Sequence, residues 1–153
     1  MSYPFEAPLL IKHVSRLLQS YLRWTGRELI PPGGPQERAK ALFYQPFVVL
    51  SHGTQPDPVL NYGNQAALDL WEMTWEEFTD MPSRLTAEPV NREDRERLLE
   101  EVKNYGYIDT YRGVRISGSG RRFLIERGTV WNIVDENNKY AGQAATFSRW
   151  TYL

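Results

Sequence analysis

Cysteine is absent from this sequence of 153 residues, and its absence removes several kinds of site at once. Disulfides, thiolate metal ligands, a cysteine nucleophile and any chromophore attached through sulfur are all excluded. Histidine is scarce as well, because His13 and His52 are the only two. Neither has a second ligand at metal-binding spacing, so no metal site is expected. Haem ligation by His52 stays open beside the ordinary interpretation, a hydrogen-bonded histidine at a strand end.

A strong charge excess and long apolar runs are also missing. The 18 basic and 19 acidic residues give a net charge of −1, which is no electrostatic footprint for nucleic acid. No run approaches the roughly 20 apolar residues that cross a bilayer. The amino terminus lacks the basic and apolar stretches of a signal peptide. We therefore expect a soluble cytoplasmic protein with no nucleic-acid or membrane partner.

Apolar and aromatic residues, by contrast, are plentiful, at 41% and 13% of the chain. This content favours one folded domain with a substantial core. Its centre is a predicted antiparallel hairpin, in which strands Arg121–Val134 and Tyr140–Trp150 are joined by a turn at Asp135–Lys139. The return strand carries small residues that leave space above the sheet, for closely packed helices or for a ligand: Ala141, Gly142, Ala144 and Ala145.

The amino-terminal part is a predicted helix, Leu9–Trp24, followed by the connector Pro31–Gly34. Residues 1–34 are therefore expected to precede a main domain of residues 35–153. The helix has an apolar stripe at helical spacing, made of Leu10, Val14, Leu17, Leu18 and Tyr21. The stripe predicts either a homodimer through Leu9–Trp24 or a helix that covers the outer face of its own sheet.

The remaining segments alternate between helices and strands. Further helices are expected at 35–44, after an Asn64 cap, after a Thr74 capping box, and at Asn91–Asn104 with Asn91 as its cap. Between and after them the apolar runs predict three more strands: Phe47–Ser51, Val59–Tyr62 and Tyr107–Ser117. This order indicates an α+β domain with an antiparallel sheet of five strands.

Several separated motifs resemble a known family. Asn64-Gln65-Ala66-Ala67 and Val134-Asp135-Glu136-Asn137 resemble segments of PAS domains. More narrowly, Asn61–Trp71, Met81–Asn91 and Gly113–Asn132 resemble the MEKHLA domain, a PAS-like domain that occurs alone in bacteria and at the carboxyl end of plant class III homeodomain–leucine zipper factors. The resemblance implies a PAS-like five-stranded antiparallel sheet with short helices on one face and an N-terminal helical extension. It also implies sensing or control of dimerisation.

A loop arginine and two tryptophans are candidate ligand contacts. Arg84 lies in the loop over the expected pocket, at its mouth, where its guanidinium could bind a carboxylate or phosphate. It could equally tie the loop to Glu88 or to a backbone carbonyl. Trp71 and Trp131 are large enough to stack on a planar ligand or to pack in the core.

Four polar residues stand in otherwise apolar strands: Arg115, Glu126, Asn132 and Gln143. If they face inward they must be paired, since an unpaired buried polar group costs about 1–3 kcal/mol, and such a cluster would form a recognition site. If they face outward, they are the polar positions of a strand in which polar and apolar side chains alternate. A bulge between Phe123 and Asp135 would reverse the facing of every residue beyond it.

These residues favour a non-catalytic sensory or regulatory module that binds a small organic ligand in its core. One alternative is an enzyme that uses the same pocket, with His52 and Asp57 or Asp69 as acid and base. Another is an interaction domain with a filled core. Neither a Ser-His-Asp arrangement nor paired carboxylates nor a phosphate loop appears, so no catalytic residue is assigned. The cofactor stays unidentified, because a cysteinyl flavin is excluded and no residue argues for a non-covalent one.

Overall fold

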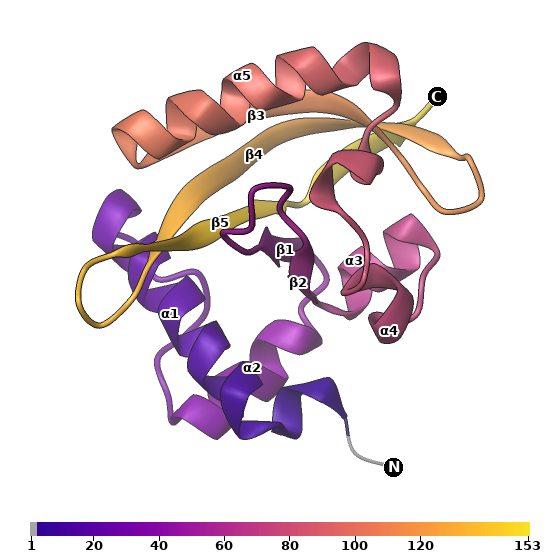
Figure 1. The fold of residues 1–153 in the computed structure, drawn as a ribbon. Helices are drawn as coiled ribbons and strands as arrows, with labels where there is room; N and C mark the ends of the chain where they lie inside the picture. The colour runs from indigo at the N-terminus through magenta and orange to yellow at the C-terminus, as the bar shows by residue number, and fades with distance from the viewer. Residues whose placement is uncertain (1–2) are drawn as a thin grey trace.

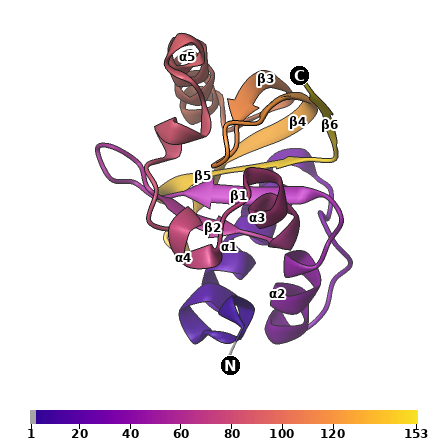
Figure 2. The ribbon, with the colours of Figure 1, turned by 90° about the vertical axis from the view of Figure 1, so that its right-hand side faces the viewer.

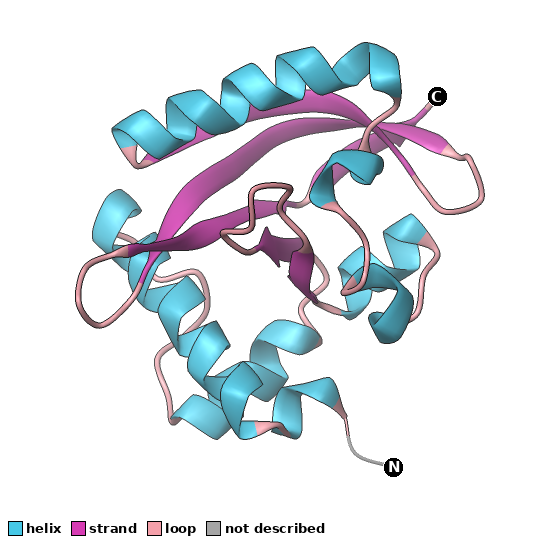
Figure 3. Cartoon of the chain, in the orientation of Figure 1, coloured by secondary structure: helices cyan, strands magenta, loops and turns pink. Residues whose placement is uncertain are grey.

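A computed structural model describes residues 3–153 and shows an α+β domain with an antiparallel sheet of six strands (Figures 1 and 3). The strand order is β2-β1-β5-β4-β3, and β6 pairs with the first half of β4. The strands are β1 (Val48–His52), β2 (Leu60–Gly63), β3 (Tyr107–Ile116), β4 (Arg122–Val134), β5 (Tyr140–Phe147) and β6 (Arg149–Tyr152). The helices are η1 (Pro4–Glu6), α1 (Pro8–Thr25), α2 (Pro35–Phe43), α3 (Gln65–Trp71), α4 (Trp75–Phe78), η2 (Ser83–Thr86) and α5 (Pro89–Tyr105).

Helices cover the two faces of the sheet differently. Helix α5 runs along one face of β3 and β4, and α1 lies across the other face (Figures 1 and 2). Two hydrogen bonds mark the faces, one from the Trp131 indole to Leu17 O of α1 and one from the Gln143 amide to Leu99 O of α5. We call the α1 side the outer face and the α5 side the inner face.

The stripe of α1 is buried within its own chain. Val14, Leu17, Leu18 and Tyr21 all belong to the hydrophobic core. The helix therefore covers the outer face of the sheet, which is the second interpretation of the stripe. A homodimer through this helix would use residues that stay exposed, such as Leu9, which is 84% exposed. None of the helices in residues 3–153 combines the length and apolar character needed to cross a membrane.

Local capping rules fix most helix ends. Asn64 caps α3, since its side chain accepts a hydrogen bond from Ala67 N at 3.2 Å, and Thr74 forms the expected capping box with Glu77. Gly106 ends α5 at positive φ. The start of α5 differs from the expected cap at Asn91. The helix begins two residues earlier, at Pro89, because proline fits the first helical position, where no N–H partner is needed.

The predicted strand Tyr140–Trp150 is two strands, β5 and β6, interrupted at Ser148. Opposite this break, β4 is irregular, and Arg127 takes a positive φ of 54°. The irregularity lies within the range where a bulge was considered, and it reverses the alternation of side chains. Phe123, before it, contacts the Trp71 ring, and Val130, after it, lines a cavity with Trp71. An odd-numbered residue before the irregularity and an even-numbered residue after it therefore lie on the same inner face.

Candidate ligand-binding cavity

A small cavity of about 50 Å³ lies between the inner face of the sheet and the segments α3, η2 and α5. Its volume suits a few water molecules, and it is about one third of the 150 Å³ that accommodates benzene in another protein. Most of its wall is apolar, and the polar part comes from both the sheet and the helices. The polar lining residues are His52, Ser83, Thr86, Arg95, Tyr111, Arg115 and Gln143, together with Ser51, whose hydroxyl lies 2.9 Å from His13 Nε2 of α1 on the outer face.

Only part of the small-residue stretch of β5 serves this cavity. Ala144 and Ala145 line it. Gly142 has another role, because a Cβ there would lie 2.2 Å from His52 O and would block the close approach of β1. Helix α5 and Trp71 fill most of the space that these small residues leave. The space above the small residues of β5 is thus filled mainly by helices, and a cavity is left between them.

Two buried polar atoms of the cavity wall have no hydrogen-bond partner within residues 3–153. They are His52 Nε2 and Trp71 Nε1. His52 Nδ1 lies 3.0 Å from Gly53 O and must donate its proton there, so in the neutral ring Nε2 is a free acceptor. Burial lowers the pKa of His52 and keeps the ring neutral. Two residues that line the cavity, His52 and Trp71, therefore each carry a buried polar atom without a partner, and the Gln143 side chain lies near the imidazole of His52.

Two buried arginines, Arg95 and Arg115, add positive charge to the same wall. They are 7% and 5% exposed. Arg95 donates to Ser83 Oγ and pairs with Glu96 at 3.3 Å, a residue whose own side chain is 66% exposed. Burial, and next the charge of Arg115, lower the pKa of the Arg95 guanidinium. The two cations are therefore close enough to repel each other.

Arg115 has no carboxylate within ion-pair distance in the part of the chain that the structure describes. Its Nη1 donates to Val114 O at 2.7 Å, and its guanidinium lies 5.3 Å from the centre of the Tyr111 ring. A backbone carbonyl and a ring face replace only part of the hydration of a guanidinium. The charge of Arg115 is therefore buried without an anion.

Sequence reasoning identified Arg115 but missed Arg95. Helix α5 is rich in charge, and in the sequence only Leu98, Leu99 and Val102 form an apolar stripe on it. That apolar stripe was itself the missed signal. Extended back by three or four residues, it reaches Arg95 on the same helical face.

Of the other predicted site residues, Trp71 and Gln143 line the cavity and Asn132 lies next to it. Gln143 Nε2 donates to Asn132 Oδ1 at 3.2 Å and to Leu99 O at 2.8 Å. Asn132 Nδ2 donates to Val102 O at 3.1 Å. These paired amides attach α5 to the sheet beside the cavity.

The remaining three predicted residues lie away from the cavity. Trp131 faces α1, where its indole donates to Leu17 O at 3.2 Å. Glu126 lies at the exposed side of β4, 3.7 Å from Arg112. Arg84 is partly buried and pairs with Asp57 at 3.2 Å, so it ties its loop to a carboxylate other than the expected Glu88.

An acid–base pair for catalysis is not assembled. His52 lines the cavity, but Asp57 pairs with Arg84 at the surface and Asp69 accepts from Gln65 Nε2 at 2.8 Å on α3. Within residues 3–153, no group of three or more His, Asp or Glu side chains is placed to hold a metal ion.

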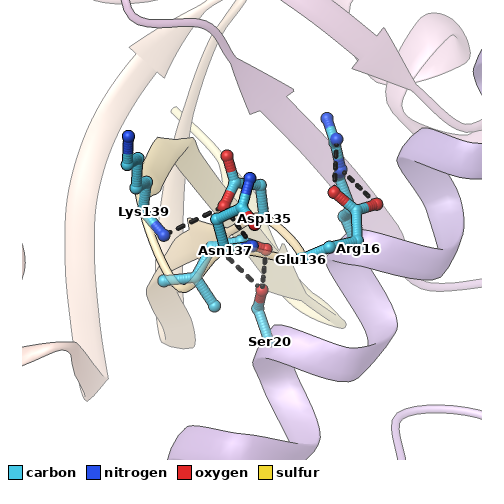
Figure 4. A network of polar contacts seen from close by, with 7 residues as sticks. Arg16, Ser20, Asp135, Glu136, Asn137 and Lys139 are labelled. Atoms are coloured by element: carbon cyan, nitrogen blue, oxygen red, sulfur yellow. Dashed lines mark hydrogen bonds and ion pairs between the residues drawn. The ribbon is translucent and has the colours of Figure 1, made fainter.

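The strands that line the cavity continue into a hairpin that binds α1 (Figure 4). Arg16 donates to both Glu136 oxygens, at 3.1 and 2.7 Å, and holds the pKa of that carboxyl at about 2. Ser20 Oγ accepts from Val134 N at 2.9 Å. Asp135 Oδ1 accepts from two backbone N–H groups of the turn, and Asn138 takes a positive φ of 62°. The inner cavity and the outer helix are thus joined by one hairpin.

Comparison with known sequences relates this chain to one family. A sequence profile of the MEKHLA domain matches residues 11–152. Among curated proteins, the homeobox-leucine zipper protein ATHB-9 of Arabidopsis thaliana is 28% identical over 97% of the chain, and REVOLUTA of the same plant is 25% identical over 97%. The chain spans 18% of the length of each relative. Both are plant proteins, and they give no support to a bacterial source.

Solved structures share the fold at low identity. The PAS domain of a protein from Colwellia psychrerythraea is 19% identical with a TM-score of 0.65, covering 77% of this chain and 95% of that one. The light-state dimer of the fungal blue-light photoreceptor Vivid is 15% identical with a TM-score of 0.65, covering 94% of this chain and 98% of that one. The PAS-like fold expected from the sequence is confirmed.

Proposed function

The chain belongs to the MEKHLA domain family, and on that premise we propose that it is a non-catalytic sensory module that binds a small organic ligand in its inner cavity. The observation that carries this proposal is that two residues lining the cavity each hold a buried polar atom without a partner, His52 Nε2 and Trp71 Nε1. Buried polar atoms without partners are rare in proteins, and each costs about 1–3 kcal/mol. A ligand with a donor and an acceptor would satisfy both.

Ligand binding would be transmitted through the sheet. Gln143 and Asn132 attach α5 to β4 and β5, and the hairpin of these strands binds Arg16 and Ser20 of α1. A ligand that moves α5 relative to the sheet would therefore alter the packing of α1. Such a ligand shifts the equilibrium only by the difference between its affinities for the two arrangements.

A cavity-filling variant tests the binding proposal. Ala145→Leu adds a larger side chain to the cavity wall, and Ala141→Leu is the matched control on the same strand outside it. The purified chain should release a small organic compound on denaturation, detected by mass spectrometry. The control should release the same compound and Ala145→Leu should not. A cavity that yields no compound from any chain would favour the interaction domain with a filled core.

A homodimer through Leu9–Trp24 is a second part of the proposal. It is supported by the similarity to Vivid, whose solved structure is a light-state dimer and aligns with 94% of this chain. Since the stripe of α1 is buried, the contact would use exposed residues such as Leu9 and Leu22. Light scattering should then give a dimer for the natural chain and a folded monomer for Leu9→Glu/Leu22→Glu. A monomer at high concentration in both would end this part of the proposal. As a separate part of it, we place the module in the cytoplasm.

A further inference from the structure

The two buried arginines point to the chemistry of the ligand. Arginine is rarely fully buried unless it is paired, because removing its charge from water is costly. Here Arg95 and Arg115 line one small cavity, and their charges act on each other. Within residues 3–153, the one carboxylate at ion-pair distance from either is the largely exposed Glu96, beside Arg95. The pair therefore lacks a buried anion.

Other charged groups nearby do not supply that anion. A surface groove of about 440 Å³ between α5 and β3 shares Arg95 and Arg115 with the cavity. Of the acidic residues along this groove, Asp94 pairs with Arg97, and no ion pair joins Glu101 to either buried arginine. The arginine pair thus stands between the interior cavity and an opening to solvent.

The rest of the cavity wall decides which anion fits. Beyond the polar groups, the lining consists of aliphatic and aromatic side chains, among them Leu50, Leu98, Val130 and Phe147. A guanidinium pairs with a planar carboxylate through two parallel hydrogen bonds. A carboxylate with a short apolar tail would therefore match both the charge and the wall. An inorganic anion would leave the apolar part of the cavity unused.

We propose that Arg95 and Arg115 together bind the carboxylate of a small organic acid, whose apolar tail occupies the inner cavity and which enters through the groove between α5 and β3. This proposal rests on the proposed function and specifies the class of ligand for the same site. The tail must be short, because the cavity measures about 50 Å³. A polar group at the far end of the tail would then satisfy His52 Nε2 and Trp71 Nε1.

The experiment compares butyrate with butyramide, which has the same size and no charge, in an NMR titration of the natural chain. Butyrate should perturb the amide signals of Val130 and Ala145 and bind at least about tenfold more tightly than butyramide. Arg95→Gln and Arg115→Gln should each weaken butyrate binding by about 10- to 100-fold. Arg149→Gln, an exposed arginine of β6 outside the cavity, is the matched control and should bind as the natural chain does.

Each other outcome overturns the assignment in a defined way. If butyramide binds in the cavity as tightly as butyrate, the carboxylate is wrong while the ligand-binding function stands. Equal binding of inorganic phosphate contradicts an organic acid. If Arg84→Gln weakens binding and the two buried variants do not, the anchor is the loop arginine. If neither probe perturbs the cavity, the carboxylate is likewise wrong, and extraction of a bound compound decides the function separately. The comparison of the two probes needs no variant, so a misfolded variant leaves the test intact.

Discussion

The polar groups on the two faces of the sheet are paired to different extents. On the outer face the polar groups of α1 and the sheet are largely paired: the Trp131 indole with Leu17 O, His13 with Ser51, and Arg16 with Glu136. One exception is the buried Tyr62 hydroxyl, which has no partner within residues 3–153. On the inner face two arginines, a histidine and an indole surround a cavity with unmet hydrogen bonds or charge. The outer face supports stability, whereas the inner face carries unmet hydrogen bonds and charge that cost stability and that the proposed ligand would satisfy.

The largest effect should follow removal of the helix that covers the outer face. A chain that starts at Pro35 loses four buried apolar side chains of α1, and each core truncation of this kind costs about 2–5 kcal/mol. Together they amount to about 8–20 kcal/mol, which is comparable to the whole stability of a typical domain, about 5–15 kcal/mol. Circular dichroism in a urea titration should show no cooperative transition, while a chain starting at Pro4 unfolds cooperatively. Cooperative unfolding of residues 35–153 would instead support them as an independent domain.

Acid should weaken the outer face next. Burial, and then Arg16, lower the pKa of His13 from 6.5 to about 4. Between these values the unfolded chain binds a proton that the folded chain does not. The stabilising contribution is therefore complete above pH 6.5 and is lost as the pH falls to 4, by up to about 3 kcal/mol.

Urea unfolding at several pH values measures this loss. His13→Gln can still hydrogen-bond Ser51 but does not titrate, so its stability should change less across the window. A smaller acid loss should persist in this variant, because the pKa of His52 is lowered as well. Parallel curves for the two chains would remove His13 as the cause.

A matched pair of tryptophan variants compares the faces directly. Both indoles are buried, but Trp131 Nε1 donates to Leu17 O and Trp71 Nε1 has no partner within residues 3–153. Replacement by phenylalanine removes a satisfied donor from the outer face and an unsatisfied one from the inner face. Trp131→Phe should therefore cost about 1 kcal/mol more than Trp71→Phe in urea unfolding. Equal losses would mean that the free indole has no energetic cost.

The smallest change is expected from Arg115→Met. The variant keeps an elongated side chain in contact with Tyr111 and removes a buried charge that has no anion. Replacing buried charge by apolar groups is often neutral or stabilising. The melting temperature should stay the same or rise, while acid binding is lost. A clear loss of stability would show that Arg115 stabilises the fold and that its buried charge has no net cost.

Much of this architecture followed from local sequence patterns, and the site followed only in part. The caps at Asn64 and Thr74 and the central hairpin were predictable, because they depend on neighbours in the sequence. The inward facing of Gln143 depended on the irregularity near Arg127, which short-range patterns do not place. Arg95 was missed because charged neighbours hid its position on the buried stripe of α5.

Arg84, by contrast, was predicted as a ligand contact and lies away from the cavity. A loop arginine near an expected pocket looks the same in the sequence whether it contacts a ligand or a surface carboxylate. Its partner, Asp57, lies in the loop between β1 and β2, and their contact depends on how two loops meet. Such long-range pairing has no signal in a single sequence, so the ion pair of Arg84 with Asp57 became apparent only in the structure.

The Asn64 side chain also has a consequence for how the domain opens. Its amide donates to Leu42 O and Phe47 O, and its oxygen accepts from Val49 N and Ala67 N. One side chain thus fastens the end of α2, the start of β1 and the first turn of α3 to a single point. None of these three segments can open separately without breaking hydrogen bonds to Asn64. In hydrogen exchange they should behave as one cooperative unit, with amide protons that become accessible together.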